Sequence, residues 1–63
     1  MNAYRLDVDA GSARQSFRLH AIEEEEAVYE AEYVLGMEPV TALSGRLYRT
    51  DGGRDEFVAE VTA

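Results

Sequence analysis

The sequence contains no cysteine, which excludes disulfide bonds and metal sites with thiolate ligands. It also contains no lysine, because all six basic residues are arginines. No apolar run approaches the ~18 residues of a membrane-spanning helix. The first residues, MNAYRLDVD, lack the basic and apolar regions of a signal peptide. We therefore expect a cytoplasmic protein that does not contact a membrane.

The chain is short and strongly acidic. Its 63 residues predict one domain, residues 1–63, which buries only about 60% of the surface of the unfolded chain. Such a domain needs a well-packed sheet on a helix, or oligomerisation, to be stable. The net charge of −7 disfavours direct binding to nucleic acid or to an anionic membrane and favours basic partners.

Nearly all of the excess negative charge falls on residues 22–36, IEEEEAVYEAEYVLG. This segment carries six glutamates and no basic residue, whereas the segment before it has a net charge of +1 and the segment after it −2. Its apolar residues recur at helical spacing and predict a helix with one stripe facing a sheet. No good N-cap residue precedes it, and Gly36 is expected just beyond its end, with Met37 making the contact that follows. The residues of the apolar stripe are Ala27, Val28, Ala31, Val34 and Leu35.

Alternation of polar and apolar residues predicts four strands around this helix. Residues 3–9 and 13–21 form the first antiparallel hairpin, in which opposite charges such as Arg18 and Asp7 meet on the open face. The inward side chains expected in this hairpin are Tyr4, Leu6, Val8, Phe17, Leu19 and Ala21.

Residues 40–50 and 55–62 form the second hairpin, joined by the turn Asp51-Gly52-Gly53. The alternation of the third strand breaks near Gly45, where we expect a β-bulge. In the fourth strand Phe57, Ala59 and Val61 are expected to face the core, with Val58 as an exception.

The predicted fold is therefore α+β, with the order β-β-α-β-β and a four-stranded, mainly antiparallel sheet that carries the acidic helix on one face. The other face is open and polar, which leaves it able to pair with a second copy of the chain. The open-face residues are expected to be Arg5, Asp7, Arg18, His20 and Glu60.

The residues do not predict catalysis, a cofactor or a metal site. His20 is the only histidine, no cysteine nucleophile exists, and the serines lie outside any nucleophile motif. Glu23, Glu26 and Glu30 share one side of the helix and could offer oxygen ligands, but no carbonyl-rich loop completes a cage. An enzyme would need an apolar pocket around a carboxylate or around His20.

The outer face of the predicted helix admits two interpretations. It is either a solvated face whose tyrosine rings lie over the sheet edge, or an acidic and aromatic binding surface for the basic groove of a nucleic-acid-binding protein. The second interpretation predicts the partner-binding residues Glu23, Glu26, Tyr29, Glu30, Glu32 and Tyr33.

A very small, cysteine-free, acidic α+β chain with the glutamate run 23–26 resembles the small phage-encoded anti-defence proteins, including anti-CRISPR proteins and other DNA mimics. The resemblance implies a non-enzymatic inhibitor of a basic nucleic-acid-binding complex, such as a CRISPR effector, and no catalytic residue. In a second likeness, the stretch FRLHAIEEEEA resembles small phage and bacterial β-β-α-β proteins. The alternative is a small structural or interaction module, either a homodimer or an antitoxin-like partner of a basic protein.

Overall fold

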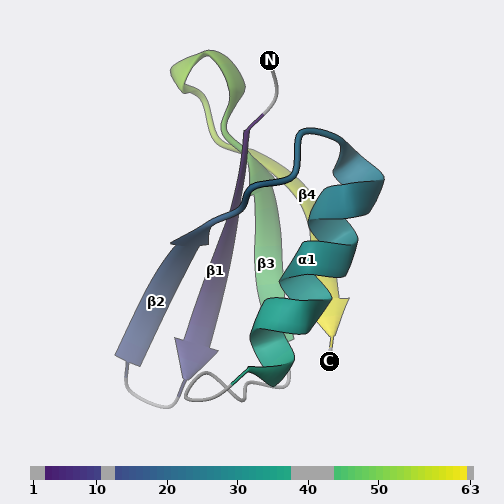
Figure 1. Ribbon diagram of the computed structural model, residues 1–63. Coiled ribbons are helices and arrows are strands. Elements are labelled where there is room, and N and C mark those ends of the chain that lie inside the picture. The colour runs from purple at the N-terminus through teal and green to yellow at the C-terminus, as the bar shows by residue number, and fades with distance from the viewer. Residues whose placement is uncertain (1–2, 11–12, 38–43, 63) are drawn as a thin grey trace.

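The computed structural model in Figure 1 describes residues 3–10, 13–37 and 44–62. The elements follow the predicted order β-β-α-β-β, with one short 3₁₀ turn inside the second hairpin. Their bounds are β1 Tyr4–Ala10, β2 Ala13–Arg18, α1 Glu24–Gly36, β3 Ser44–Arg49, η1 Asp51–Gly53 and β4 Glu56–Thr62. Parts of the first turn and of the predicted third strand, residues 11–12 and 40–43, lie outside the described residues.

The four strands form one sheet in the order β2-β1-β3-β4, and every neighbouring pair is antiparallel. The helix α1 packs across one face of this sheet, on β3, β4 and β1, and no described element covers the opposite face (Figure 1). The predicted α+β fold class is therefore confirmed. In the described part of the chain, no helix combines the length and apolar character that a membrane crossing requires.

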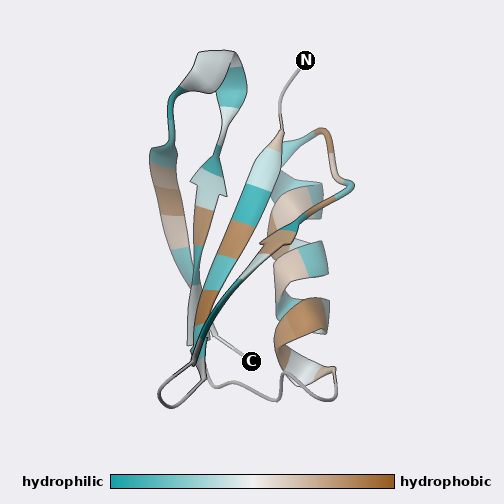
Figure 2. Ribbon diagram, turned by 90° about the vertical axis from the view of Figure 1, so that its left-hand side faces the viewer, coloured by the Kyte–Doolittle hydropathy of each residue, from teal (hydrophilic) through white to brown (hydrophobic). Residues whose placement is uncertain are grey.

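The core lies between α1 and the covered face of the sheet. Figure 2 shows the alternation that creates it, as brown and teal bands along the strands. The predicted helical stripe is confirmed, since Ala27, Ala31 and Leu35 are fully buried while Val28 and Val34 pack at its margins. The buried side chains are Tyr4, Leu6, Val8, Leu19, Ala27, Ala31, Leu35, Leu47 and Val61.

The second strand is shorter than predicted. β2 ends at Arg18, after which the backbone N–H of Leu19 still donates to the carbonyl oxygen of Tyr4 at 3.0 Å. The chain then leaves the sheet, so His20 lies in the connection to α1 and not in a strand. The expected meeting of Arg18 and Asp7 is also wrong, because the register places Arg18 opposite Arg5 and Asp7 opposite Ser16.

Both ends of α1 differ from the prediction. The helix begins at Glu24, with Glu23 at the N-cap position and no side-chain hydrogen bond there. Gly36 is the last helical residue, and the positive-φ glycines of the described chain are Gly52 and Gly53. A left-handed residue is not needed because Met37 is extended and its N–H donates to the carbonyl oxygen of Val34 at 3.1 Å.

The β-bulge lies in β4, not at Gly45. Leu47 is opposite Ala59 and Tyr48 is opposite Phe57, so Val58 is the extra residue. Because of this insertion Phe57 turns to the open face, where its side chain is 55% exposed, and Val58 packs against the core. The prediction that Phe57 faces the core is therefore wrong, and the exception noted at Val58 is the bulge itself.

Gly45 has a different role. It pairs regularly with Val61, and an added Cβ atom would lie 2.9 Å from Leu6 Cδ1 and 3.0 Å from the backbone oxygen of Asp7. The glycine is therefore required by close packing beneath the helix. The predicted turn at Asp51–Gly53 is confirmed, with φ of 64° at Gly52 and 78° at Gly53.

Candidate functional site

The outer face of α1 is defined by the stripe that the helix buries. Because Ala27, Ala31 and Leu35 face the sheet, the residues on the opposite side project into solvent. Tyr29 and Tyr33 are one turn apart and their side chains are 75% and 72% exposed. Their rings therefore do not rest over the sheet edge, as one of the two interpretations of this face required.

Five glutamates at the start and along the outer side of α1 are also exposed. No ion pair involves any of them in the part of the chain that the structure describes. The cause is their placement, because every arginine of the chain lies outside α1. We call this surface the acidic–aromatic face; it consists of Glu23, Glu24, Glu25, Glu26, Tyr29, Glu32 and Tyr33.

Negative charge at the start of α1 is compatible with helix stability. Glu24, Glu25 and Glu26 occupy the first turn, where the positive end of the helix dipole favours each carboxylate by about 0.3–1 kcal/mol. An open depression on the same surface is lined by Glu24, Glu25, Val28, Tyr29 and Glu32. The arrangement can therefore accept basic side chains between carboxylates and an aromatic ring.

Glu30 differs from the other predicted binding residues. Its Oε1 accepts hydrogen bonds from the backbone N–H groups of His20 at 2.9 Å and of Ala21 at 3.0 Å, and its Oε2 lies 3.0 Å from the N–H of His20. The carboxylate thus fastens the middle of the helix to the connection that follows β2. The sequence alone groups Glu30 with the binding residues, because its hydrogen-bond partners lie nine and ten residues away and follow no periodic pattern. The one indication is the segment between β2 and α1, because its backbone N–H groups need hydrogen-bond acceptors.

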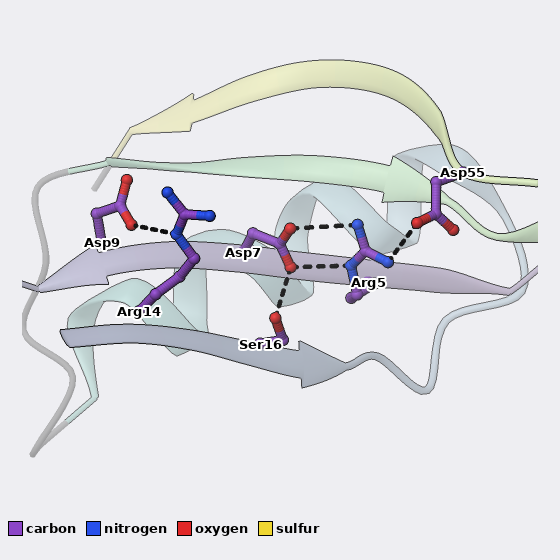
Figure 3. Close-up of polar contacts among 6 residues, drawn as sticks. All are labelled: Arg5, Asp7, Asp9, Arg14, Ser16 and Asp55. Atoms are coloured by element: carbon purple, nitrogen blue, oxygen red, sulfur yellow. Dashed lines mark hydrogen bonds and ion pairs between the residues drawn. The ribbon is translucent and has the colours of Figure 1, made fainter.

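The open face of the sheet carries a network centred on Arg5 (Figure 3). Arg5 Nε lies 2.8 Å from Asp7 Oδ1 and Arg5 Nη1 lies 2.7 Å from Asp55 Oδ2. Ser16 Oγ donates to Asp7 Oδ1 at 2.8 Å, and the guanidinium carbon of Arg5 stands 4.8 Å from the ring centroid of Tyr48. The hydrogen bonds that Arg5 donates to Asp55, and then to Asp7, raise the pKa of Arg5. Because the pKa of Arg5 is raised in the folded state, the stability that its charged guanidinium contributes is lost as the pH rises through that pKa.

Two further ion pairs involve arginines of the strands. Arg14 Nε lies 3.2 Å from Asp9 Oδ1, and Arg49 pairs with Glu56 across the second hairpin. The Glu56 carboxylate raises the pKa of Arg49. Sequence reasoning missed the role of Asp55, which reaches Arg5 from the other end of the chain.

The carboxylates on the side of α1 that could offer oxygen ligands to a metal ion are Glu23, Glu26 and Glu30. Over residues 3–10, 13–37 and 44–62, no group of three or more histidine, aspartate or glutamate side chains is placed to hold a metal ion. Glu23, Glu26 and Glu30 therefore do not form a ligand set, and Glu30 is bound to backbone donors.

Comparison of the chain with protein-family models, with curated proteins and with solved structures found no match.

Proposed function

We propose that the protein is a non-enzymatic inhibitor of the anti-CRISPR or DNA-mimic type, acting in the host cytoplasm. In this proposal the acidic–aromatic face covers the basic nucleic-acid-binding surface of a defence complex. The observation that carries the proposal is the exposure of five glutamates and two tyrosines at the start and along the outer side of α1, with no arginine among them. Glu30 is excluded from the contact set because it anchors the helix.

The glutamates concentrate negative charge at the start of α1. Glu23 to Glu26 are consecutive, and Glu32 follows six residues later, about 9 Å further along the helix. A groove that binds a phosphate backbone is basic and would attract this cluster of carboxylates.

The two tyrosines supply contact area that carboxylates alone lack. Tyr29 and Tyr33 stand in the middle of the face, one helical turn apart. Exposed tyrosines are enriched among residues that dominate binding energy, and their rings stack on arginine guanidinium groups. The carboxylates would thus steer the approach to the groove, and the rings would hold the complex together.

The experiment compares two triple variants that neutralise the same number of charges. One is E25Q/E26Q/E32Q, on the acidic–aromatic face. The other is D51N/E56Q/E60Q, in the second hairpin, whose residues are also exposed. Each is immobilised beside the wild type, exposed to lysate of a host with an active defence complex, and challenged with duplex DNA. Circular dichroism establishes that each variant is folded.

We expect the wild type and the hairpin variant to capture a nucleic-acid-binding complex that DNA or salt displaces, and the helix variant to capture none. Capture of the same complex by a folded helix variant would overturn the proposal.

The second candidate, an antitoxin-like module that binds a basic protein, uses the same exposed face. It differs in one respect, because its partner would not be displaced by DNA. Capture that is lost in E25Q/E26Q/E32Q but is insensitive to duplex DNA would favour this candidate.

A further inference from the structure

Among the residues that the structure describes, those on the open face of the sheet carry no net charge, although the whole chain carries −7. In β1, every second side chain is buried in the core and those between them lie on the open face (Figure 3). The residues opposite them on the neighbouring strands lie on the same face. Two copies of the chain repel each other through their helices, but they can bring these neutral faces together. The charged groups of the open face are Arg5, Arg14, Arg18 and Arg46, balanced by Asp7, Asp9, Asp55 and Glu60.

The open face also presents aromatic surface beside the charges. Tyr48 and Phe57 form an edge-to-face pair with ring centroids 5.8 Å apart, and Phe57 remains 55% exposed. Aromatic residues beside arginine are typical of the centres of protein interfaces. The β4 bulge at Val58 is what brings Phe57 to this face.

Two rows of side chains cross the sheet in register. In the order β2, β1, β3, β4, the first row is Arg18, Arg5, Tyr48 and Phe57. The second row, in the same order, is Ser16, Asp7, Arg46 and Glu60.

We propose that the open face binds the same face of a second copy of this chain, about a two-fold axis that runs along the strands between β1 and β3. This axis lays β1 of one copy over β3 of the other, and β2 over β4. Asp7 then meets Arg46 of the second copy, and Arg5 meets its Tyr48. At the outer strands Ser16 meets Glu60 of the second copy, and Arg18 meets its Phe57.

Each row in one copy is electrostatically complementary to the same row in the second copy, because no charged side chain meets one of the same sign. An axis along β1 would instead place Arg5 on Arg5 and Asp7 on Asp7. Face-to-face sheets pack about 10 Å apart with an angle of about 30°, so the central pairs stay in contact while the outer pairs diverge. The contact between Asp7 and Arg46 is therefore the decisive one.

The surface around this contact has space for an incoming side chain. A hollow of about 170 Å³ lies on the open face, and its lining includes Asp7, Arg46, Tyr48 and Glu60. Arg46 is exposed and makes no side-chain hydrogen bond or ion pair within the described residues. It is therefore available to the Asp7 carboxylate of the second copy.

The size of the face sets the strength of the dimer. Four strands at ~4.8 Å spacing, each about 20 Å long, give a footprint of roughly 400 Å² per copy, which is small for a specific interface. We therefore expect a dimer that dissociates on dilution. It directs both acidic–aromatic faces outward, and its existence does not depend on the proposed inhibitory function.

The test is the mass of the chain in solution, measured by sedimentation equilibrium over a concentration series. Arg46→Glu lies on the open face, whereas Arg54→Glu lies in the exposed segment before β4 and changes the net charge equally. We expect the wild type and Arg54→Glu to approach twice the 7.0 kDa of the chain, and Arg46→Glu to stay at 7.0 kDa. A wild type that is monomeric at every concentration, or an Arg46→Glu variant that dimerises like Arg54→Glu, would overturn the proposal.

A second variant separates the interface from net charge. Phe57→Arg makes the chain less acidic, yet it places a positive charge opposite Arg18 of the second copy. We expect it to be monomeric as well, with the circular dichroism spectrum of the wild type. A dimer as tight as that of the wild type would contradict the proposed axis.

Discussion

At the scale of single residues, Glu26 and Glu30 are one helical turn apart but have different environments. The Glu26 side chain is exposed, whereas the Glu30 carboxylate accepts hydrogen bonds from two backbone N–H groups of the β2–α1 connection. We expect Glu30→Ala to lower the free energy of unfolding by about 1–2 kcal/mol, because these donors lose a charged acceptor.

The matched control is Glu26→Ala, which removes the same charge and the same side chain from an exposed position. It should lower the free energy of unfolding by less than about 1 kcal/mol, the most that the interaction of this carboxylate with the helix dipole contributes. Urea unfolding followed by circular dichroism measures both variants. Equal stability of the two variants would show that Glu30 is not an anchor.

Glycine supplies a second contrast between residues. An alanine Cβ at position 45 would lie 2.9 Å from Leu6 Cδ1 and 3.3 Å from Leu35 Cδ2, whereas at position 36 nothing lies within 4 Å. We expect Gly45→Ala to cost about 1–3 kcal/mol through overpacking. Gly36→Ala should stabilise the fold by up to about 1 kcal/mol, because alanine loses less backbone entropy on folding. Thermal unfolding of the two variants should show midpoints displaced in opposite directions, and a neutral Gly45→Ala would contradict the packing described here.

At the scale of elements, the bulge in β4 determines which side chains enter the core. We expect Phe57→Ala to cost no more than about 1.5 kcal/mol, the usual contribution of an aromatic pair, because the ring lies on the open face. Val61→Ala, in the same strand, should cost about 1–3 kcal/mol because Val61 is buried. A loss of 3–5 kcal/mol in Phe57→Ala, typical of a buried phenylalanine, would mean that the ring faces the core.

The same strand shows how far the sequence predicts this fold. Element type and order follow from periodicity, because the strands and α1 each bury one face and the pattern records that face. The position of the bulge does not follow from the sequence. One inserted residue in β4 makes Phe57 and Val58 exchange faces, and both are apolar, so either could face the core. The break in alternation at Gly45 predicts a bulge from the sequence, but its cause is close packing against Leu6, a partner that no local pattern identifies.

The candidate site was predictable to a similar degree. The exposure of Tyr29 and Tyr33 follows from the helical stripe on the opposite side of α1. The role of Glu30 depends on a hydrogen bond to the β2–α1 connection, whose path is set by the end of β2 at Arg18. Contacts of this kind arise from tertiary structure and leave no periodic signal.

At the scale of the whole molecule, the two faces differ in charge. The acidic–aromatic face carries five carboxylates without a basic residue, and the open face of the sheet balances four arginines with four carboxylates. A charged face of one sign attracts a basic surface over a distance, whereas a neutral face with alternating charges suits contact with its own copy. In the two proposals made above, the fold separates the surface for a basic partner from the surface for self-association.

The measurement that tests the central claim most directly is the salt dependence of binding to the captured complex. Each carboxylate that takes the place of a phosphate should contribute to the slope of log affinity against log salt concentration. We predict a smaller slope and weaker binding for E25Q/E26Q/E32Q, and wild-type values for D51N/E56Q/E60Q. Equal slopes and affinities for the two folded variants would contradict the claim that the acidic–aromatic face of α1 is the binding surface.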